Sequence, residues 1–192
     1  IGGVAAGLKQ CGVESGDRVA WVLPNSPEAL VTTLACYRIG AIAVPLNVRY
    51  VANELLDVIE RTDPKVTVIE AARERETRPL LKPDAVLLTV ADSDRSAGSF
   101  AAMWDLAPID DMPVAPDHPA LILFTSGSTG LPKGVVHSHV GAYSAIDVSR
   151  RVFDLGVDDM VLVGKPLCHA GGLNTQLLAT LLAGGEVVLA MK

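Results

Sequence analysis

Residues 121–139 read LILFTSGSTGLPKGVVHSH, an apolar stretch that runs directly into a segment of glycine, serine and threonine. The apolar part, 120–124, has the length and composition of a buried strand. The decapeptide 125–134 then carries four hydroxyl side chains and one ammonium group, that of Lys133. Ligands of open α/β sheets bind at the carboxyl ends of parallel strands. The stretch therefore predicts an α/β fold whose ligand site lies where this strand ends.

The rest of the chain repeats an alternation of short apolar strands and helices. Strands are predicted at 18–23, 42–46, 66–69, 85–90, 120–124, 160–163 and 186–190. Because these segments are almost continuously apolar and helical stretches separate them, we expect a parallel sheet covered on both faces. The predicted fold is a three-layer αβα arrangement with a largely parallel sheet.

Two of the helices are marked by their end signals. Ser26 is placed to cap a helix that has Pro27 in its first turn, and Gly40 ends that helix. The next helix begins near Ala52, and the Asp-Pro pair at 63–64 stops it. Both helices are predicted to belong to the scaffold.

Composition and charge limit the classes of protein to which the chain can belong. Its 192 residues include 16 Lys and Arg against 22 Asp and Glu, for a net charge of −6. This acidic balance lacks the basic footprint of nucleic-acid-binding proteins, so nucleic acid is not expected as a partner. The three widely spaced cysteines fit no disulfide framework and predict a cytoplasmic location. Glycine and polar residues interrupt the apolar run 170–191, so no transmembrane span is expected.

The segment 125–134 has the chemistry of a phosphate site. Gly127 and Gly130 let backbone amides approach a ligand closely, the hydroxyls donate hydrogen bonds and Lys133 adds a compact positive charge. A surface turn is the plainer interpretation of a glycine- and serine-rich stretch. The buried strand before it and the lysine within it favour the phosphate site.

A Walker P-loop is a different kind of phosphate site, and the sequence departs from it. The spacing from Gly127 to Lys133 matches, but Pro132 and Gly134 stand where that motif needs glycine and serine or threonine. The chain also continues extended up to Ser138, so no helix N-terminus lies directly under the phosphates. A Walker NTPase is therefore disfavoured.

Together with four other segments, this loop resembles the signature of the adenylate-forming superfamily, which contains acyl-CoA synthetases, firefly luciferase and peptide-synthetase adenylation domains. The segments that look like family motifs are 12–20, 23–28, 40–47 and 166–173. The resemblance implies that residues 1–192 are part of the large N-terminal AMP-binding domain of the acyl-CoA synthetase/luciferase-like fold, with the phosphate loop at 125–134. The remainder of that domain and the C-terminal domain are expected to be absent. From its ends we expect a fragment of a protein about two to three times longer.

Members of this superfamily activate a carboxylate by attack on the α-phosphate of Mg·ATP, and then pass the acyl group from the adenylate to a thiol. The resemblance thus implies ATP, Mg²⁺ and, as a substrate, CoA. The implied phosphate contacts are Thr125, Ser126, Gly127, Ser128, Thr129, Gly130 and Lys133. Thr125 would also lie beside Mg²⁺, and Lys133 has an implied catalytic role because it neutralises the phosphates that leave.

A second implied site is centred on His169. Alone, this histidine is more readily interpreted as a satisfied polar residue, but in the pattern 166–173 the resemblance makes it a catalytic and substrate-binding wall of the acid pocket. Gly171 is implied as a further substrate contact. Cys168 is predicted to be a buried, inert thiol and not a nucleophile.

His137 and His139 form an H-x-H pair that invites a metal-site interpretation. No third ligand of matching character lies nearby in the sequence, so a structural role beside the loop is favoured.

Asn47 and the histidine motif resemble acyl- or aryl-CoA ligases more than peptide-synthetase adenylation domains. Among these, a medium- or long-chain fatty acyl-CoA ligase is expected. An aryl-CoA ligase or a peptide-synthetase adenylation domain is retained as the alternative. An unusual phosphate-loop hydrolase and a noncatalytic α/β binding module are less favoured. The expected partners are small molecules; peripheral membrane contact and a homo-oligomer stay open.

The chain lacks other parts that the family uses. These are the adenine-binding segment with its Mg²⁺-ligating glutamate, the ribose-binding aspartate and the C-terminal catalytic lysine. We therefore expect the chain on its own to be inactive, and the full-length protein to be an AMP-forming acid–thiol ligase.

Overall fold

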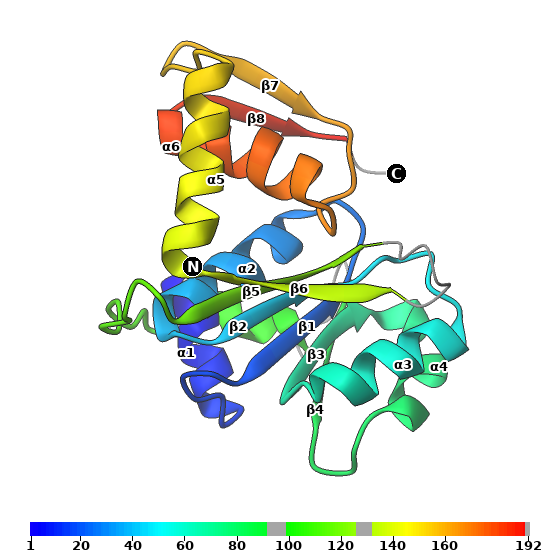
Figure 1. Ribbon diagram of the computed structural model, residues 1–192. Helices are drawn as coiled ribbons and strands as arrows, with labels where there is room; N and C mark the ends of the chain where they lie inside the picture. The colour runs from blue at the N-terminus through cyan, green and yellow to red at the C-terminus, as the bar shows by residue number, and fades with distance from the viewer. Residues whose placement is uncertain (92–98, 126–131, 191–192) are drawn as a thin grey trace.

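A computed structural model describes residues 1–91, 99–125 and 132–190 (Figure 1). Six strands form one sheet in the order β4-β3-β1-β2-β5-β6, and only the β5–β6 pair is antiparallel. These strands are β1 (Arg18–Val22), β2 (Ile42–Pro45), β3 (Val66–Glu70), β4 (Val86–Val90), β5 (Pro119–Thr125) and β6 (Lys133–Ser138). A separate two-stranded parallel sheet consists of β7 (Met160–Val163) and β8 (Glu186–Leu189).

Helices cover both faces of the larger sheet. The α-helices are α1 (Gly2–Gln10), α2 (Pro27–Ile39), α3 (Ala52–Thr62), α4 (Glu74–Thr77), α5 (His139–Val152) and α6 (Ala179–Ala183). Shorter 3₁₀ turns are η1 (Ala71–Arg73), η2 (Arg78–Leu80) and η3 (Phe100–Asp105), and η4 (Gly171–Leu178) is π-helical. In the described part of the chain, no helix has both the length and the apolar character needed to cross a membrane.

The three-layer prediction is confirmed by the alternation along β1. Val19 and Trp21 belong to one buried cluster with side chains of α1 and α2, whereas Ala20 and Val22 belong to a second cluster with side chains of α3. Successive residues of a strand point to opposite faces of the sheet. The two clusters are therefore the two interfaces between the sheet and its helical layers.

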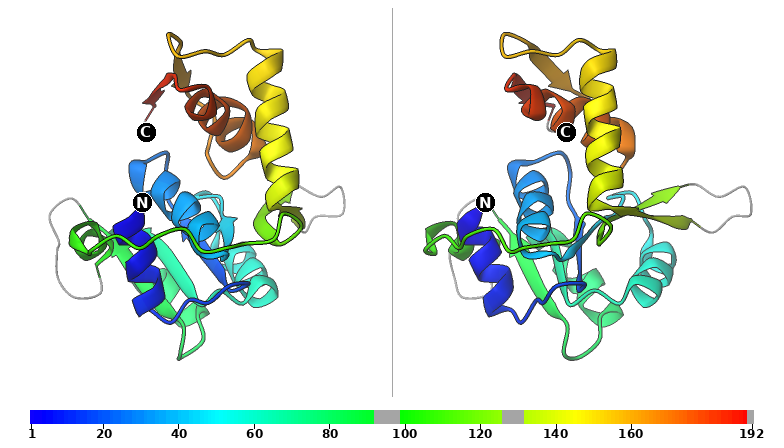
Figure 2. Two further views of the ribbon diagram at one scale, coloured as in Figure 1. Left: turned by 90° about the vertical axis from the view of Figure 1, so that its left-hand side faces the viewer. Right: turned by 60° about the vertical axis from the view of Figure 1, so that its left-hand side comes forward.

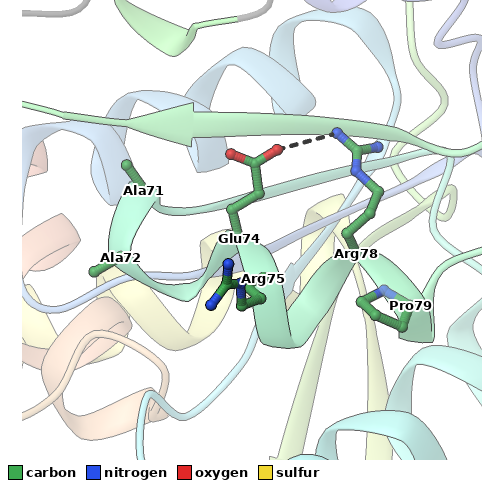
Figure 3. A pocket seen from close by; sticks show the side chains of 6 residues that line it. All are labelled: Ala71, Ala72, Glu74, Arg75, Arg78 and Pro79. Atoms are coloured by element: carbon green, nitrogen blue, oxygen red, sulfur yellow. Dashed lines mark ion pairs between the residues drawn. The ribbon is translucent and has the colours of Figure 1, made fainter.

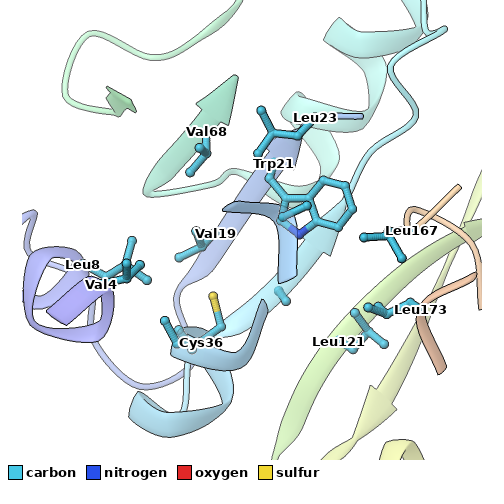
Figure 4. Packing of buried hydrophobic residues seen from close by; sticks show 14 of the residues in the cluster. Val4, Leu8, Val19, Trp21, Leu23, Cys36, Val68, Leu121, Leu167 and Leu173 are labelled. Carbon is cyan, nitrogen blue, oxygen red and sulfur yellow. The ribbon is translucent and has the colours of Figure 1, made fainter. Parts of the chain in front are cut away.

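The first cluster extends beyond the larger sheet. Leu167 and Leu173, which flank His169, are fully buried in it together with Leu121 of β5 (Figure 4). Trp21 lies in the same cluster and is 0% exposed. The segment around His169 is thus anchored in the main hydrophobic core.

The prediction that all seven strands share one sheet was wrong for the last two. Helix α5 has 14 residues and carries the chain away from the larger sheet before β7 begins (Figure 2). At about 1.5 Å per residue, such a helix is about 20 Å long. Because of this displacement, β7 and β8 pair with each other and not with β6.

The predicted loop 125–134 is shorter in the structure. Thr125 is the last residue of β5, and Lys133 and Gly134 begin β6, in which Lys133 lies opposite Thr125. Antiparallel pairing satisfies the backbone groups that a loop would leave open. The expected extended path to Ser138 is confirmed, and the Ser138 hydroxyl then accepts a hydrogen bond from the Gly141 amide of α5 (3.2 Å).

The end signals of α2 and α3 are also confirmed. Ser26 Oγ accepts a hydrogen bond from the amide of Ala29 (3.3 Å), and Gly40 ends α2 with a φ of 71°. Asp63 ends α3 in the same left-handed region, with a φ of 45°. These positions lie where local chemistry alone sets the helix boundary.

Replacing Ser26 with alanine is expected to lower the free energy of unfolding by about 1 kcal/mol, because the first turn of α2 loses its side-chain acceptor. Urea unfolding followed by circular dichroism measures this change. Ser149→Ala is the matched control, since Ser149 lies within α5 and its hydroxyl bonds to the carbonyl of Ala145 (2.9 Å). Equal losses in the two variants, or none in Ser26→Ala, would contradict the capping role.

Candidate active site

A cavity of about 710 Å³ lies where β2 and β5 end, next to a turn that precedes η4. Three parts of the chain line it: Asn47, Tyr50 and Glu54 after β2; Leu123, Phe124, Thr125, Pro132, Val135 and His137 of the β5–β6 hairpin; and His169 and Ala170. The cavity thus occupies the carboxyl edge of the sheet, where the sequence predicted the ligand site.

The β5–β6 hairpin forms one wall of this cavity. Thr125 lies opposite Lys133, Leu123 opposite Val135, and the cavity-lining His137 lies further along β6. Directly opposed residues of an antiparallel pair share a face of the sheet. Lys133 therefore begins β6 on the same face as Thr125, Leu123 and Val135, at the end of the hairpin.

Lys133 and Thr125 are both exposed, so their polar groups are available to a ligand. The Thr125 hydroxyl donates one long hydrogen bond to the Lys133 carbonyl (3.4 Å). Within the described ranges, the Lys133 ammonium has no ion-pair partner. The other five predicted phosphate contacts, Ser126, Gly127, Ser128, Thr129 and Gly130, lie outside the described residues.

His169 is exposed, and the two residues before it, Leu167 and Cys168, are buried. Its amide donates to the carbonyl of Pro166 (3.2 Å), and its carbonyl accepts from the amides of Gly172 and Leu173 (3.0 Å each). The structure brings His169 into the cavity together with Thr125. Gly171 does not line the cavity, because it is turned toward Lys165: a Cβ at Gly171 would lie 3.3 Å from Cδ of that side chain.

Gly172 closes the same turn tightly. A Cβ at this position would lie 2.4 Å from the Pro166 carbonyl oxygen and 2.7 Å from that of Lys165. Only glycine permits such a close approach of two backbone segments. The π-helical stretch η4 begins at this contact, and such stretches are frequent at functional sites.

Cys168 is buried as predicted, with 6% of its surface exposed. Burial raises the pKa of its thiol to about 11. The thiolate is the nucleophilic form of cysteine, and it is scarce at neutral pH with such a pKa. The cavity therefore offers no activated thiol at this position.

The two histidines of the H-x-H pair face different surroundings. His137 lines the cavity, whereas His139 begins α5 and packs against the ring of Tyr37 (5.6 Å between centroids) and that of His118 (6.3 Å). Burial lowers the pKa of His139, and the neighbouring His118 lowers it further. In the described ranges, no three side chains among His, Cys, Asp and Glu gather as a metal-ligand set.

Sequence reasoning missed Tyr50 and Glu54 as cavity residues. Burial raises the pKa of Tyr50, and Cys168 and Glu54 add to that shift. The Glu54 carboxylate accepts a hydrogen bond from the amide of Val51 (3.1 Å), which fixes the start of α3. The available signal was their position just after a strand end that adjoins β5, but the strand order was needed to use it.

A second hollow of about 500 Å³ lies on η1, α4 and η2 (Figure 3). Its lining residues are Ala71, Ala72, Glu74, Arg75, Arg78 and Pro79. Glu74 and Arg78 form an ion pair across one turn (3.7 Å). None of the predicted site residues lines this hollow, so the cavity at His169 is the candidate active site.

Comparison with known proteins gives the family. Residues 2–192 match the AMP-binding enzyme family. The chain is 38% identical to a feruloyl-CoA synthase of an Amycolatopsis species over 187 residues, which are 97% of this chain and 36% of the relative. It is 31% identical over 184 residues to a long-chain-fatty-acid–CoA ligase of Mycobacterium tuberculosis, covering 91% of this chain and 35% of that protein.

Among solved structures, ATP-bound MatB from Rhodopseudomonas palustris superposes with a TM-score of 0.90 at 30% identity, over 99% of this chain and 38% of that one. This chain therefore spans 35% to 38% of the length of these three proteins. The relatives are CoA ligases, and the fold is that of adenylate-forming enzymes. The match over residues 2–192 and the shared fold together show that the chain belongs to the AMP-binding enzyme family.

Proposed function

We propose that the full-length protein is an AMP-forming acid–CoA ligase and that this chain, as part of its N-terminal domain, supplies one side of the ATP and acid sites. The enzyme would activate a carboxylic acid with ATP to an acyl-adenylate and pyrophosphate, and then transfer the acyl group to CoA. One observation carries the proposal: a single cavity joins the ends of the hairpin that flanks 126–131 to the turn that bears His169.

In the proposed reaction, a carboxylate oxygen attacks the α-phosphorus and the bond to pyrophosphate breaks. Negative charge therefore grows on the leaving phosphates. The backbone of Lys133 is fixed in β6 at the end of the hairpin, so its ammonium group would lie within reach of that charge and stabilise it. His169, on the opposite wall, would hold the acid in line with the α-phosphate.

Mg²⁺ would assist by neutralising the phosphate oxygens of ATP. The oxygen of Thr125 fits such an ion, because it is exposed and, among the residues that the structure describes, makes one long hydrogen bond. Mg²⁺ keeps several waters and usually takes one or two protein ligands beside the phosphates. Thr125 is thus proposed to supply one oxygen, and other protein ligands would come from outside this chain.

Two classes of carboxylic acid are candidates for the substrate. A medium- or long-chain fatty acid is proposed first, and the mycobacterial relative supports it. An aromatic acid is the second candidate, favoured by the higher identity to feruloyl-CoA synthase, 38% against 31%. The cavity walls near His169 combine apolar and polar side chains and suit either class.

The proposal is tested by acid-dependent exchange of labelled pyrophosphate into ATP. The full-length protein is assayed with octanoate, palmitate, ferulate and 4-hydroxybenzoate, and thioester formation with CoA is followed by mass spectrometry. Exchange that needs an acid supports the ligase, and the preferred acid selects the class. ATP hydrolysis without any acid would support a hydrolase instead. The 192-residue chain, assayed alongside, is expected to show no exchange.

Replacing His169 with alanine in the full-length protein is expected to raise KM for the acid about tenfold and to change KM for ATP less than twofold, because the side chain would contact the acid. Steady-state kinetics with the preferred acid measure both constants. His139→Ala is the comparison, since His139 lies outside the cavity. An unchanged acid KM in His169→Ala would count against the assigned role.

A further inference from the structure

Asn25 is a buried polar residue that joins two distant parts of the chain. It is 9% exposed and lies between β1 and α2. Its Nδ2 donates to the carbonyls of Lys165 (3.0 Å) and Val163 (3.5 Å), and its Oδ1 accepts from the amide of Leu167 (2.9 Å). The Asn25 carboxamide thus fixes residues 163–167, which lead from the end of β7 to the turn that bears His169. This segment is called the strap below.

The chemistry of this contact requires an amide side chain. The strap presents two carbonyl acceptors and one amide donor to the same point, and asparagine both donates and accepts. Aspartate would retain only the acceptor, and an apolar side chain would take this partner from the Lys165 carbonyl and the Leu167 amide. The Val163 carbonyl would keep its hydrogen bond from the Ala190 amide (3.1 Å). Asn25 is itself held firmly, because the next residue, Ser26, caps α2.

The strap in turn determines where His169 lies. Leu167 is buried in the main core, with 1% of its surface exposed, and Pro166 accepts a hydrogen bond from the His169 amide (3.2 Å). Gly172 packs against the Pro166 carbonyl from the other side. Between the Asn25 contact at Leu167 and His169 there is only one residue, so a shift of the strap moves His169 directly.

We propose that Asn25 is a positioning residue for the acid site: its carboxamide fixes the strap so that His169 faces the cavity. Asn25 does not itself line the cavity. The expected change in KM for the acid rests on the proposed acid–CoA ligase function, but the effect of Asn25 on the strap can be measured without that function. Small displacements of groups that position a substrate lower rates steeply, by about 10²-fold for 1 Å.

The test compares Asn25→Ala and Asn25→Asp with Thr33→Val in the full-length protein. Thr33 is the matched control because it is also buried in the β1–α2 unit: its hydroxyl accepts from the Trp21 indole N–H (3.1 Å) and donates to the Ala29 carbonyl (2.9 Å). Thr33→Val removes buried hydrogen bonds of similar number without touching the strap. A general loss of stability would therefore affect all three variants.

Asn25→Ala is expected to raise KM for the acid about tenfold while KM for ATP changes less than twofold. Asn25→Asp is expected to do the same, since it keeps only the bond to Leu167 and sets a carboxylate against two carbonyls. Thr33→Val should leave both constants within twofold. In a His169→Ala background, Asn25→Ala should add less than twofold to the acid KM, because its effect passes through that histidine.

Hydrogen exchange of the backbone amides provides a readout that does not depend on activity. The amides of Leu167 and His169 should exchange at least tenfold faster in Asn25→Ala than in the wild type, and remain unchanged in Thr33→Val. If Asn25→Ala does not fold, Asn25→Asp is measured in its place. The role of Asn25 would be overturned if the Asn25 variants left hydrogen exchange at Leu167 and His169 unchanged, if they left KM for the acid unchanged, or if Thr33→Val had equal effects. A wild-type protein that shows no acid-dependent exchange of pyrophosphate into ATP would refute the proposed function. Hydrogen exchange of the Leu167 and His169 amides would then test by itself whether Asn25 fixes the strap.

Discussion

Lys133→Ala in the full-length protein is expected to lower the rate of acid-dependent pyrophosphate exchange by about 10²- to 10³-fold. The physical reason is the position of the ammonium group. It is exposed at the start of β6, opposite Thr125, and flanks the segment proposed to hold the phosphates. Because negative charge grows on the leaving phosphates during the reaction, loss of the ammonium group raises the energy of the transition state more than that of bound ATP. Initial rates at saturating ATP and acid measure the effect.

Lys82→Ala is the matched control for Lys133→Ala. Lys82 is also an exposed lysine, but it pairs with Asp63 (2.8 Å), away from the cavity. Its removal should leave the exchange rate within twofold. Lys133→Arg keeps the charge but changes its shape, and should recover part of the lost rate. Exchange in Lys133→Ala within threefold of wild type would refute the role. If the protein shows no pyrophosphate exchange and Lys133→Ala leaves its affinity for nucleotide unchanged, a binding module would be favoured.

Trp21→Ala is expected to lower the free energy of unfolding by about 3 to 5 kcal/mol. Trp21 is the largest of the fully buried side chains, and its indole N–H bonds to Thr33 (3.1 Å). Its ring belongs to the cluster that joins β1 and α2 to Leu167 and Leu173 (Figure 4). Removal leaves a void where these elements meet. Because whole domains are stable by about 5 to 15 kcal/mol, this loss is a large share of the total.

Urea or thermal unfolding followed by circular dichroism measures the loss in Trp21→Ala. The second tryptophan is the matched control, since Trp104 is 40% exposed and its ring contacts that of Phe100 at 5.8 Å. Trp104→Ala should cost about 1 kcal/mol. Comparable losses in the two variants would mean that the core is not centred on Trp21.

The parts of the fold that local chemistry controls were predictable from the sequence. Ser26 and Gly40 set the ends of α2 through a side-chain acceptor and a left-handed backbone, and both effects act within a few residues. Strands β1 to β5 of the larger sheet were likewise placed to within one residue at each end, whereas β6 was expected only as an extended path and not as a strand. The alternation of apolar strands and helices then sufficed for a three-layer fold.

Pairing between distant strands was not predictable in the same way. The segments that became β7 and β8 have the same apolar character as those of the larger sheet, and nothing within them specifies a partner. Their partner is decided by α5, which carries the chain out of reach of β6. For the same reason Tyr50 and Glu54 were missed, since their place in the cavity depends on which strands are neighbours.

The candidate site was predicted in outline. Thr125 and His169 were singled out by motif and share a cavity, and Lys133 lies opposite Thr125 at the same end of the hairpin. Gly171 was expected beside the substrate but does not line the cavity, because the path of the turn depends on tertiary contacts at Gly172. The phosphate contacts from Ser126 to Gly130 stay predictions.

The hydrogen bonds between Asn25 and the strap also have a consequence for the order in which the parts of the chain fold. The hydrogen bond from the Leu167 amide to Asn25 spans 142 positions of the chain. At synthesis rates of about 5 to 20 residues per second, the Leu167 half is made about 7 to 28 s after the Asn25 half. Strands β1 to β4 are made within the first 90 residues and have most of that interval to pair, whereas β6 ends only 29 positions before Leu167. We therefore expect the turn that bears His169 to dock onto a sheet whose first four strands have already paired.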